Sequence, residues 1–327
     1  MNIKAYFLLF GLLFLFPACG KQEFPNQSDL NYKQEMRQLV ENISNYARNQ
    51  HPGFIVIPQN GVELVSNTGD ETGQADMNYL NAIDGLGQED LFYGYTHDNT
   101  PTPQDESQYL MHFLDLAKNS TQTKIMVTDY CFDHAKMDDA IMKNQEKGYL
   151  GFVADHRSLD DIPEYPNPVI GENNADILSL NQSKNFLYLI NPDNQYATAQ
   201  DFVNAVANTS YDVVIMDLFF NGKPYSTQQM NQLKHKSNGG QRLLIAYMSI
   251  GEAEDYRYYW QTDWSSNPPV WLEKENPDWK GNYYVQYWNP QWQNIIYGNA
   301  DSYIQKIIDA GFDGTYLDVV DAFERYE

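Results

Sequence analysis

Short apolar stretches alternate with amphipathic ones along most of the chain. The pattern predicts short buried strands such as 124–130 (KIMVTDY), 213–219 (VVIMDLF) and 243–249 (LLIAYMS), with apolar residues at helical spacing in the segments between strands. Strands that are apolar throughout and separated by helices are typical of parallel sheets covered on both faces. Further strands are predicted at 53–61, 90–95, 148–154, 185–191 and 315–317, with a possible one at 283–288. That many strands favour a (β/α)8 barrel over an open doubly wound sheet.

The N-terminal residues form a different kind of segment. An apolar run at 6–16 is too short to cross a membrane, is typical of a secretory signal, and leads into FPACG, with a small residue before Cys19. We therefore predict a lipoprotein signal peptide at 1–18, lipid attachment at Cys19 and a tether at 19–32; the alternative is an ordinary signal peptide. Because the other cysteine is Cys131, acylation of Cys19 leaves no partner for a disulfide.

Charge and length narrow the class of protein. The chain carries 44 acidic and 21 basic residues, a formal net charge of −23. This balance argues against nucleic acid as a partner, since phosphate binding needs clustered Lys and Arg, and it favours a cationic or neutral ligand. Roughly 300 residues remain after the signal, which suits one barrel domain at 33–327. We expect a monomer in the cell envelope that faces the periplasm or the exterior and touches the membrane through the lipid anchor only.

Carboxylates stand at or beside the ends of several predicted strands: Glu89, Asp129, Asp217, Glu252, Asp318 and Asp321. In a (β/α)8 barrel the active site forms at the C-terminal ends of the strands, and two carboxylates are the minimal equipment for glycoside hydrolysis. No zinc-spaced His/Cys cluster, G-x-S-x-G elbow or Gly-rich phosphate loop is present, so no metal or cofactor is expected. Any one of these residues, taken alone, is equally consistent with a helix cap or a loop salt bridge, and Asp129 and Asp321 are expected to be structural.

Two motifs, LLIAYMSIGEAEDYRYYW (243–260) and GFDGTYLDVVDAFE (311–324), resemble glycoside hydrolase family 114, the family related to endo-α-1,4-polygalactosaminidase. The closer resemblance is to its bacterial subgroup once misnamed cysteinyl-tRNA synthetase-like, and VVIMDLFFNG (213–222) is similar to the second strand of the family. The resemblance covers nearly all of the chain after residue 33. It implies a (β/α)8 TIM barrel that acts on galactosamine-containing polysaccharide.

The matching segments follow a different order from that of the family. The resemblance implies a circular permutation in which 33–162 corresponds to the C-terminal half of the family barrel and 185–327 to its N-terminal half. The Pro-rich stretch 163–184 would then join the old ends. Because the first and last strands of a barrel are adjacent, such a join costs little loop-closure entropy. The alternative is two unrelated half-domains in tandem.

The resemblance also implies the site residues. Asp318 matches the Asp of the family's LD pair, and Glu89 in QEDLF matches its E-x-L-F element. The sequence does not distinguish the nucleophile from the acid/base; we take Asp318 as nucleophile and Glu89 as acid/base, with the reverse assignment as the alternative. Residues expected to bind substrate are Asn60, Asp217, Tyr247, Glu252 and Tyr316. Where this chain reads YLDV, the polygalactosaminidases read closer to EPDN, a departure that bears on the substrate rather than on the fold.

The sequence therefore predicts a lipid-anchored glycoside hydrolase that cleaves an extracellular amino-sugar-containing polysaccharide or oligosaccharide by a two-carboxylate mechanism. An acidic cleft would attract the ammonium groups of such a polymer. The alternative is a glycan-binding surface lipoprotein without catalysis, which the many aromatic residues also suit. The separation of Asp318 and Glu89 discriminates between the two, because a hydrolase needs its carboxyl groups about 5 to 10 Å apart.

Overall fold

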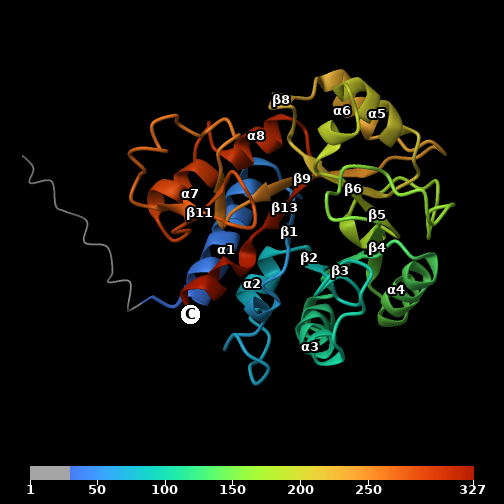
Figure 1. Ribbon diagram of the computed structural model, residues 1–327, viewed down its shortest axis with the longest axis horizontal. Helices are drawn as coiled ribbons and strands as arrows, with labels where there is room; N and C mark the ends of the chain where they lie inside the picture. The colour runs from blue at the N-terminus through green and yellow to red at the C-terminus, as the bar shows by residue number, and fades with distance from the viewer. Residues whose placement is uncertain (1–29) are drawn as a thin grey trace, which may run out of the picture. The chain divides into compact units, whose positions relative to one another are not determined.

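The computed structural model describes residues 30–327, and Tyr32–Glu327 forms one compact unit (Figure 1). The predicted signal peptide at 1–18, the lipid-attachment residue Cys19 and the tether up to residue 29 lie outside the described residues. Within the described part, no helix has both the length and the apolar character needed to cross a membrane.

Parallel strands form the centre of this unit. A five-stranded sheet has the order β1-β13-β9-β6-β5, and a three-stranded sheet has the order β2-β3-β4, with every pairing in both sheets parallel. The strands are β1 (Ile55–Pro58), β2 (Gly85–Glu89), β3 (Lys124–Tyr130), β4 (Leu150–Ala154), β5 (Phe186–Tyr188), β6 (Val213–Asp217), β9 (Leu243–Ser249) and β13 (Gly314–Asp318). The mixed α/β class with a parallel central sheet is the class that the sequence predicts.

The two sheets meet at both of their edges. A parallel bridge between Gln59 and Gly87 connects the end of β1 to β2, and the backbone N–H of Asn60 donates to the carbonyl of Gly87 at 2.9 Å. At the other edges, β4 packs beside β5. Each of these parallel strands therefore has a neighbouring strand on both sides.

Helices surround the parallel strands (Figure 1): α1 (Tyr32–Gln50), α2 (Met77–Ala82), α3 (Gln104–Thr121), α4 (His134–Lys147), α5 (Ala199–Ala207), α6 (Thr227–Leu233), α7 (Pro290–Ile296) and α8 (Tyr303–Asp309). Several begin at a side-chain cap that satisfies free backbone N–H groups. Asp76 accepts from Asn78 and Tyr79, and Asp133 accepts from Ala135. The 3-10 turns are η2 (Val62–Val65), η3 (Leu180–Gln182), η4 (Pro192–Asn194) and η5 (Val320–Tyr326).

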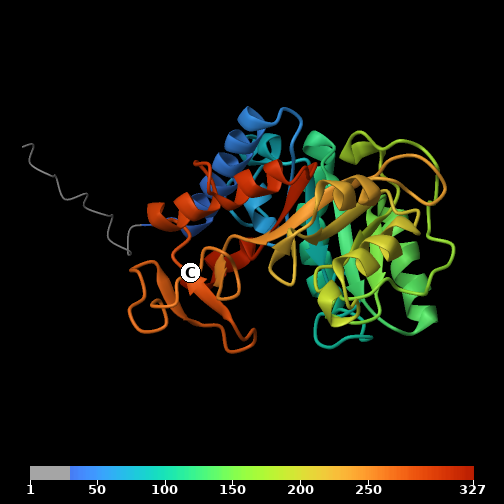
Figure 2. The same ribbon diagram turned by 90° about the horizontal axis from the view of Figure 1, so that it is seen from above.

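Helix α1 lies against the C-terminal part of the chain. It packs on α8 and η5, and Figures 1 and 2 both show the blue helix beside red segments. The Lys33 ammonium pairs with the side chain of Glu327, the last residue, and the ring of Tyr32 stacks on that of Tyr326 at 5.1 Å between centroids. The first helix and the last turn therefore share one packed layer.

Two small antiparallel sheets accompany the parallel strands. One has the order β10-β12-β11, with β10 at Glu252–Glu254, β11 at Leu272–Glu275 and β12 at Asn282–Val285; the other pairs β7 (Phe219–Phe220) with β8 (Lys223–Pro224). The possible strand predicted at 283–288 thus corresponds to the shorter β12.

The prediction of a strand at 90–95 is wrong. The strand is β2, Gly85–Glu89, and the residues after it form bends and turns. Glycine in place of an apolar residue hides this strand from the hydrophobic pattern. The physical reason for glycine is space, because a Cβ at Gly87 would lie 2.0 Å from the hydroxyl oxygen of Tyr316. The correction moves Glu89 from a position before a strand to the C-terminal end of one.

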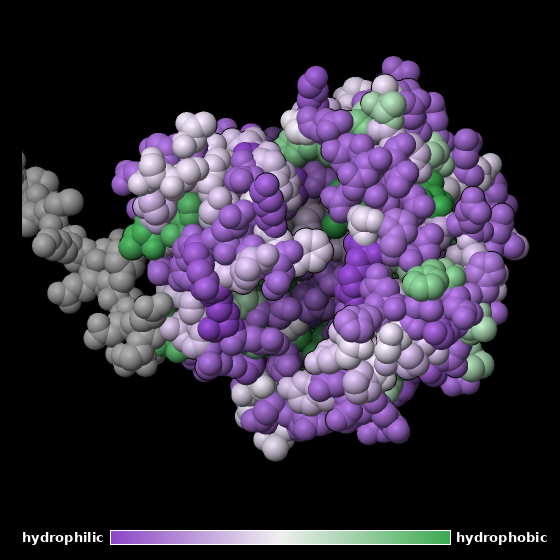
Figure 3. Space-filling view, viewed as in Figure 1, coloured by the Kyte–Doolittle hydropathy of each residue, from purple (hydrophilic) through white to green (hydrophobic). Residues whose placement is uncertain are grey.

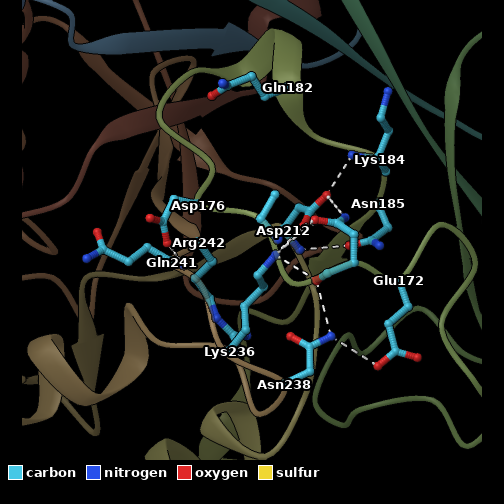
Figure 4. A network of polar contacts seen from close by, with 12 residues as sticks. Glu172, Asp176, Gln182, Lys184, Asn185, Asp212, Lys236, Asn238, Gln241 and Arg242 are labelled. Carbon is cyan, nitrogen blue, oxygen red and sulfur yellow. Dashed lines mark hydrogen bonds and ion pairs between the residues drawn. The ribbon is translucent and has the colours of Figure 1, made fainter.

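The segment 163–184, predicted as a joining stretch, is tied to the body by a buried ion pair (Figure 4). Lys236 and Asp212 are 2.9 Å apart, and both side chains have no exposed surface. The Asn173 amide donates to both Asp212 oxygens at 3.1 and 3.0 Å, and the backbone N–H of Lys184 donates to Asp212 at 2.8 Å. Because a buried pair is tolerated only when its remaining hydrogen-bonding capacity is filled, the segment and the pair depend on each other.

Removal of one partner should therefore be costly. Lys236→Met leaves the Asp212 charge buried without a counter-ion, and we expect the free energy of unfolding to fall by about 3–5 kcal/mol in chemical denaturation. The matched control is Lys234→Met, because Lys234 pairs with Asp313 at 2.9 Å near the surface and should contribute below about 1 kcal/mol. Equal losses in the two variants would contradict this account.

Candidate active site

A cavity of about 1020 Å³ opens at the C-terminal ends of the parallel strands. Gln59 just past β1, Glu89 at the end of β2, Tyr130 at the end of β3, Tyr247 within β9 and Asp318 at the end of β13 all line it. Figure 3 shows the face viewed in Figure 1 hollowed near its centre. The C-terminal ends of parallel strands lie at one end of the fold, so residues far apart in sequence meet there.

The two carboxylates assigned as catalytic are brought together by one side chain. Nε2 of Gln59 donates to Oε2 of Glu89 at 2.6 Å and to Oδ1 of Asp318 at 3.1 Å. The two acceptor oxygens therefore lie no more than about 6 Å apart, which is below the roughly 6.5–9.5 Å of an inverting glycosidase pair and compatible with the roughly 5–5.5 Å of a retaining one. The amide orientation follows from chemistry, because an ionised carboxylate accepts hydrogen bonds and cannot donate them.

Other donors fix each carboxylate. Asp318 accepts from the hydroxyl of Tyr247 at 2.5 Å and from the backbone N–H of Val319 at 2.8 Å. Val319 has φ of 58°, a strained conformation for a β-branched residue, and this turn brings its N–H back onto Asp318. Glu89 accepts from the hydroxyl of Tyr130 and from the Asn60 amide at 3.3 Å.

The two carboxyl groups differ in their electrostatics. Burial raises the pKa of Glu89 to about 7, and the negative charge of Asp318 adds to the rise. Burial also raises the pKa of Asp318, while the hydrogen bonds from Tyr247 and Val319 oppose that rise. Two close carboxylates in a low-dielectric site do not readily ionise together, so near neutral pH one proton is shared unequally and Glu89 is the group that holds it.

Arg157 supports the Glu89 side of the site. Its guanidinium lies 4.3 Å from the ring centroid of Tyr130 and pairs with Asp90 and Asp98, each at 2.7 Å. The cation therefore holds the phenol that donates to Glu89.

Arg257 lines the same cavity with two acidic partners. It pairs with Asp217 at 2.7 Å and with Glu254 at 2.6 Å, and all three side chains are almost fully buried. Asp217 lines the cavity as expected, but its charge is compensated by Arg257, so it is not a free carboxylate. Sequence reasoning missed Arg257 and Glu254, although both stand in the motif at 243–260.

Glu252 also lines the cavity, but both of its oxygens are engaged. They accept from the Asn276 amide at 2.7 Å and from the Asn282 amide at 3.1 Å, and the residue is only 4% exposed. Glu252 therefore anchors the connection between β11 and β12 instead of presenting a free group to substrate.

Two of the residues expected to bind substrate, Tyr316 and Asn60, lie outside the lining of the cavity. Tyr316 is fully buried with its ring 5.2 Å from that of Tyr188, and Asn60 positions Glu89 by accepting from its backbone N–H at 3.1 Å. Neither residue lines the cavity. We therefore assign both to supporting roles in place of the contact expected of them, while Tyr247 does line the cavity and touches Asp318.

The two carboxylates expected to be structural differ from each other. Asp129 accepts from the backbone N–H groups of Phe92 and Tyr93 at 2.7 and 3.0 Å and from the Asn144 amide at 3.0 Å, a structural arrangement. Asp321 instead lines the cavity, and burial together with the Asp318 charge raises its pKa well above the usual range. Asp321 is therefore corrected from a structural residue to a third acidic group of the site.

Gln59 and Tyr130 are the functional residues that sequence reasoning missed on the catalytic side. Each stands at the end of a predicted strand, Gln59 beside Asn60 and Tyr130 beside Asp129. Position at the end of a strand is the signal that could have found them, because an amide or a phenol at that place reaches the same cavity as a carboxylate.

One group of possible metal ligands exists within the described residues, namely Asp155, His156 and Asp161. His156 is already engaged, with its ring nitrogens 2.6 Å from Asp155 and from Asp160. The hydrogen bond with Asp160 raises the pKa of His156, which disfavours the neutral imidazole that a metal requires.

Residues 173–327 match the family model of Glycoside-hydrolase family GH114. The predicted relation to this family is confirmed at that level, and the finer subgroup stays a prediction. The matched part contains Asp318, Tyr247 and Arg257, whereas Glu89 and Gln59 precede it.

Curated relatives come from three microorganisms. An uncharacterized protein of Methanocaldococcus jannaschii is 44% identical over 127 residues, which are 38% of this chain and 34% of that protein. Uncharacterized proteins of Deinococcus radiodurans and Thermotoga maritima are 40% identical over 129 residues and 37% identical over 121 residues. The match to the Deinococcus radiodurans protein covers 39% of this chain and 39% of that protein. The match to the Thermotoga maritima protein covers 37% of this chain and 36% of that protein. The chain thus spans little more than a third of the length of these relatives.

The electrostatic coupling between Glu89 and Asp318 can be tested by titration. Asp318→Asn removes the negative neighbour of Glu89, so we expect the pKa of Glu89 to fall below about 7 in a carboxyl carbon-13 NMR titration. Asp309→Asn on the exposed side of α8 is the control and should leave it unchanged. An unchanged or higher pKa of Glu89 in Asp318→Asn would show that the two groups are not neighbours.

Proposed function

We propose that this GH114-like protein is a glycoside hydrolase whose catalytic pair is Asp318 and Glu89. The observation that carries the proposal is the single Gln59 amide nitrogen hydrogen-bonded to both carboxylates in the large cavity. The family match of residues 173–327 supports glycosidase chemistry independently of this geometry.

We also propose that the parallel strands form a closed (β/α)8 barrel. Support comes from the order of the strands, the bridge from β1 to β2 and the packing of β4 beside β5. A single ring of strands also accounts for the meeting of residues from β1, β2, β3, β9 and β13 in one cavity.

A circular permutation of the family order is part of the proposal. The family match begins only at residue 173, while Glu89 and Gln59 come from the preceding part of the chain. The contacts of Lys33 with Glu327 and of Tyr32 with Tyr326 are those expected if the first helix continues the barrel after its last turn. The anchored segment 163–184 would then be the join between the old ends.

The proposed reaction retains configuration at the sugar carbon. Asp318, ionised and oriented by Tyr247 and the Val319 N–H, attacks the anomeric carbon while Glu89 donates its proton to the leaving glycosidic oxygen. A glycosyl–Asp318 ester results. Glu89, now ionised, then takes a proton from water as that water attacks the anomeric carbon, which releases the sugar and restores both groups.

The proposed substrate is an extracellular polysaccharide that contains amino sugars. Asp321 and Glu324 line the cavity with the catalytic pair, and this acidic lining suits ammonium groups. The proposal includes lipid attachment at Cys19 and a place in the cell envelope, which would keep a monomeric enzyme next to extracellular glycan.

The first test is release of reducing ends from a glycan panel that includes partly deacetylated α-1,4-galactosaminogalactan. We expect release by the parent protein and a loss of roughly 10²–10⁴-fold or more in both Asp318→Asn and Glu89→Gln. Asp309→Asn should retain parental activity. Binding of a glycan by all variants without release by the parent would instead favour a glycan-binding protein without catalysis.

A second test uses the pH dependence of kcat/KM. Because Glu89 must be protonated to donate to the leaving group, activity should fall as pH rises through about 7. The hydrogen bond from Tyr130 lowers the pKa of Glu89, so Tyr130→Phe should move this alkaline limb to higher pH. A limb that stays in place or moves to lower pH would assign the proton to another group.

A further inference from the structure

One tryptophan differs from all the others. The chain has six tryptophans, all within the described residues, and five of them pack against aromatic rings: Trp260, Trp264, Trp271, Trp288 and Trp292. Trp279 is 60% exposed and contacts no aromatic ring in the described part of the chain. Single exposed apolar side chains are common on protein surfaces, so the exposure of Trp279 gains its meaning from where the ring lies.

Trp279 belongs to the cavity that holds the catalytic pair. It lines this cavity together with Lys280 and Asn282. Tyr256 is equally exposed and lines the same cavity, but the Arg257 guanidinium lies 5.0 Å from its ring centroid and its hydroxyl is bonded to Glu254. Unlike Tyr256, Trp279 therefore presents to the cavity an aromatic face that no described cation or aromatic ring covers.

The connection that carries Trp279 is built to hold a shape. The backbone N–H of Asn276 donates to the carbonyl of Asn282 at 2.7 Å, and that of Asn282 donates to the carbonyl of Trp279 at 3.1 Å. The turn closes at Gly281, whose φ of 88° suits glycine. Below it, the buried Glu252 carboxylate holds both Asn276 and Asn282.

The size of the cavity exceeds what one sugar ring needs. Its volume of about 1020 Å³ is at the upper end of the roughly 300–1,000 Å³ typical of pockets that bury most of a drug-sized ligand. A ring positioned for attack at Asp318 leaves room for further sugars along the cavity. The apolar C–H face of a pyranose packs on an aromatic ring, whereas its hydroxyl groups meet the polar lining.

We propose that Trp279 is the stacking platform of a distal sugar subsite, fixed in place by Glu252, so that the protein engages an oligosaccharide over several residues. This inference rests on the proposed glycosidase function. It gives Glu252, whose oxygens are both occupied, a role in substrate recognition through the connection that it anchors.

The test compares short and long substrates. With the partly deacetylated galactosaminogalactan and its short oligosaccharides as probes, Trp279→Ala should weaken binding and raise KM about tenfold for the polymer, with little change in kcat or for the shortest cleaved oligosaccharide. Trp279→Tyr should restore most of the affinity. Phe132→Ala is the matched control, because Phe132 is also 60% exposed but lies outside the cavity. Binding is measured on the Asp318→Asn background, so that cleavage does not interfere.

The outcomes separate the two proposals. If the parent cleaves the polymer and Trp279→Ala matches it for every length, or loses short and long substrates equally, the platform is refuted and the hydrolase stands. If neither the parent nor its variants bind or cleave any glycan of the panel, both proposals are overturned. Circular dichroism of Trp279→Ala identifies a folding defect, and the Trp279→Tyr variant then decides the case.

Discussion

One nitrogen atom, Nε2 of Gln59, links the two carboxyl groups on which the site depends. Glu89 and Asp318 belong to different parallel strands and are far apart in sequence, yet each accepts a hydrogen bond from that amide. Such proximity has a consequence, because two buried carboxylates at this separation do not ionise independently. The shared donor and the shared low dielectric thus divide the pair into a proton holder, Glu89, and an anion, Asp318, which is the division of roles that acid-assisted nucleophilic chemistry needs.

Charges are buried at both ends of the strands, with different results. At the N-terminal end of β6, Asp212 and Lys236 compensate each other and their hydrogen bonds hold the segment 163–184 in place. At the other end, Arg257 compensates Asp217 and Glu254, while Asp318, Glu89 and Asp321 share a cavity with no cation paired to them among the described residues. Burial raises the pKa values of these three carboxyl groups, and neighbouring negative charges add to the rise, whereas the charges elsewhere are compensated by their partners.

Burial also explains where the sequence misled. Strand β2 contains Gly85 and Gly87 and lacks the continuous apolar pattern, because the Leu180 side chain fills the space beside Gly85 and the Tyr316 ring fills the space beside Gly87. The same packing removes Tyr316 from the cavity. Glu252 and Asp217 stand where the motifs place them, but neighbouring amides and Arg257 occupy their oxygens. Hydrogen-bond partners decide whether a carboxylate is free, and they are contributed by segments whose position a linear pattern does not reveal.

The sequence by itself determined the alternation of strands and helices, the acidic composition, the family relation and the candidacy of Glu89 and Asp318, because each depends on local pattern or on motifs of consecutive residues. Tertiary structure alone decided which carboxylates lack a cationic partner, that Gln59 and Tyr130 donate hydrogen bonds to them, and that Trp279 stands exposed at the cavity. Those properties depend on distances between residues on separate strands and on the water that packing excludes. A pKa or a free aromatic face is a property of the surroundings, and only the folded chain brings those surroundings together.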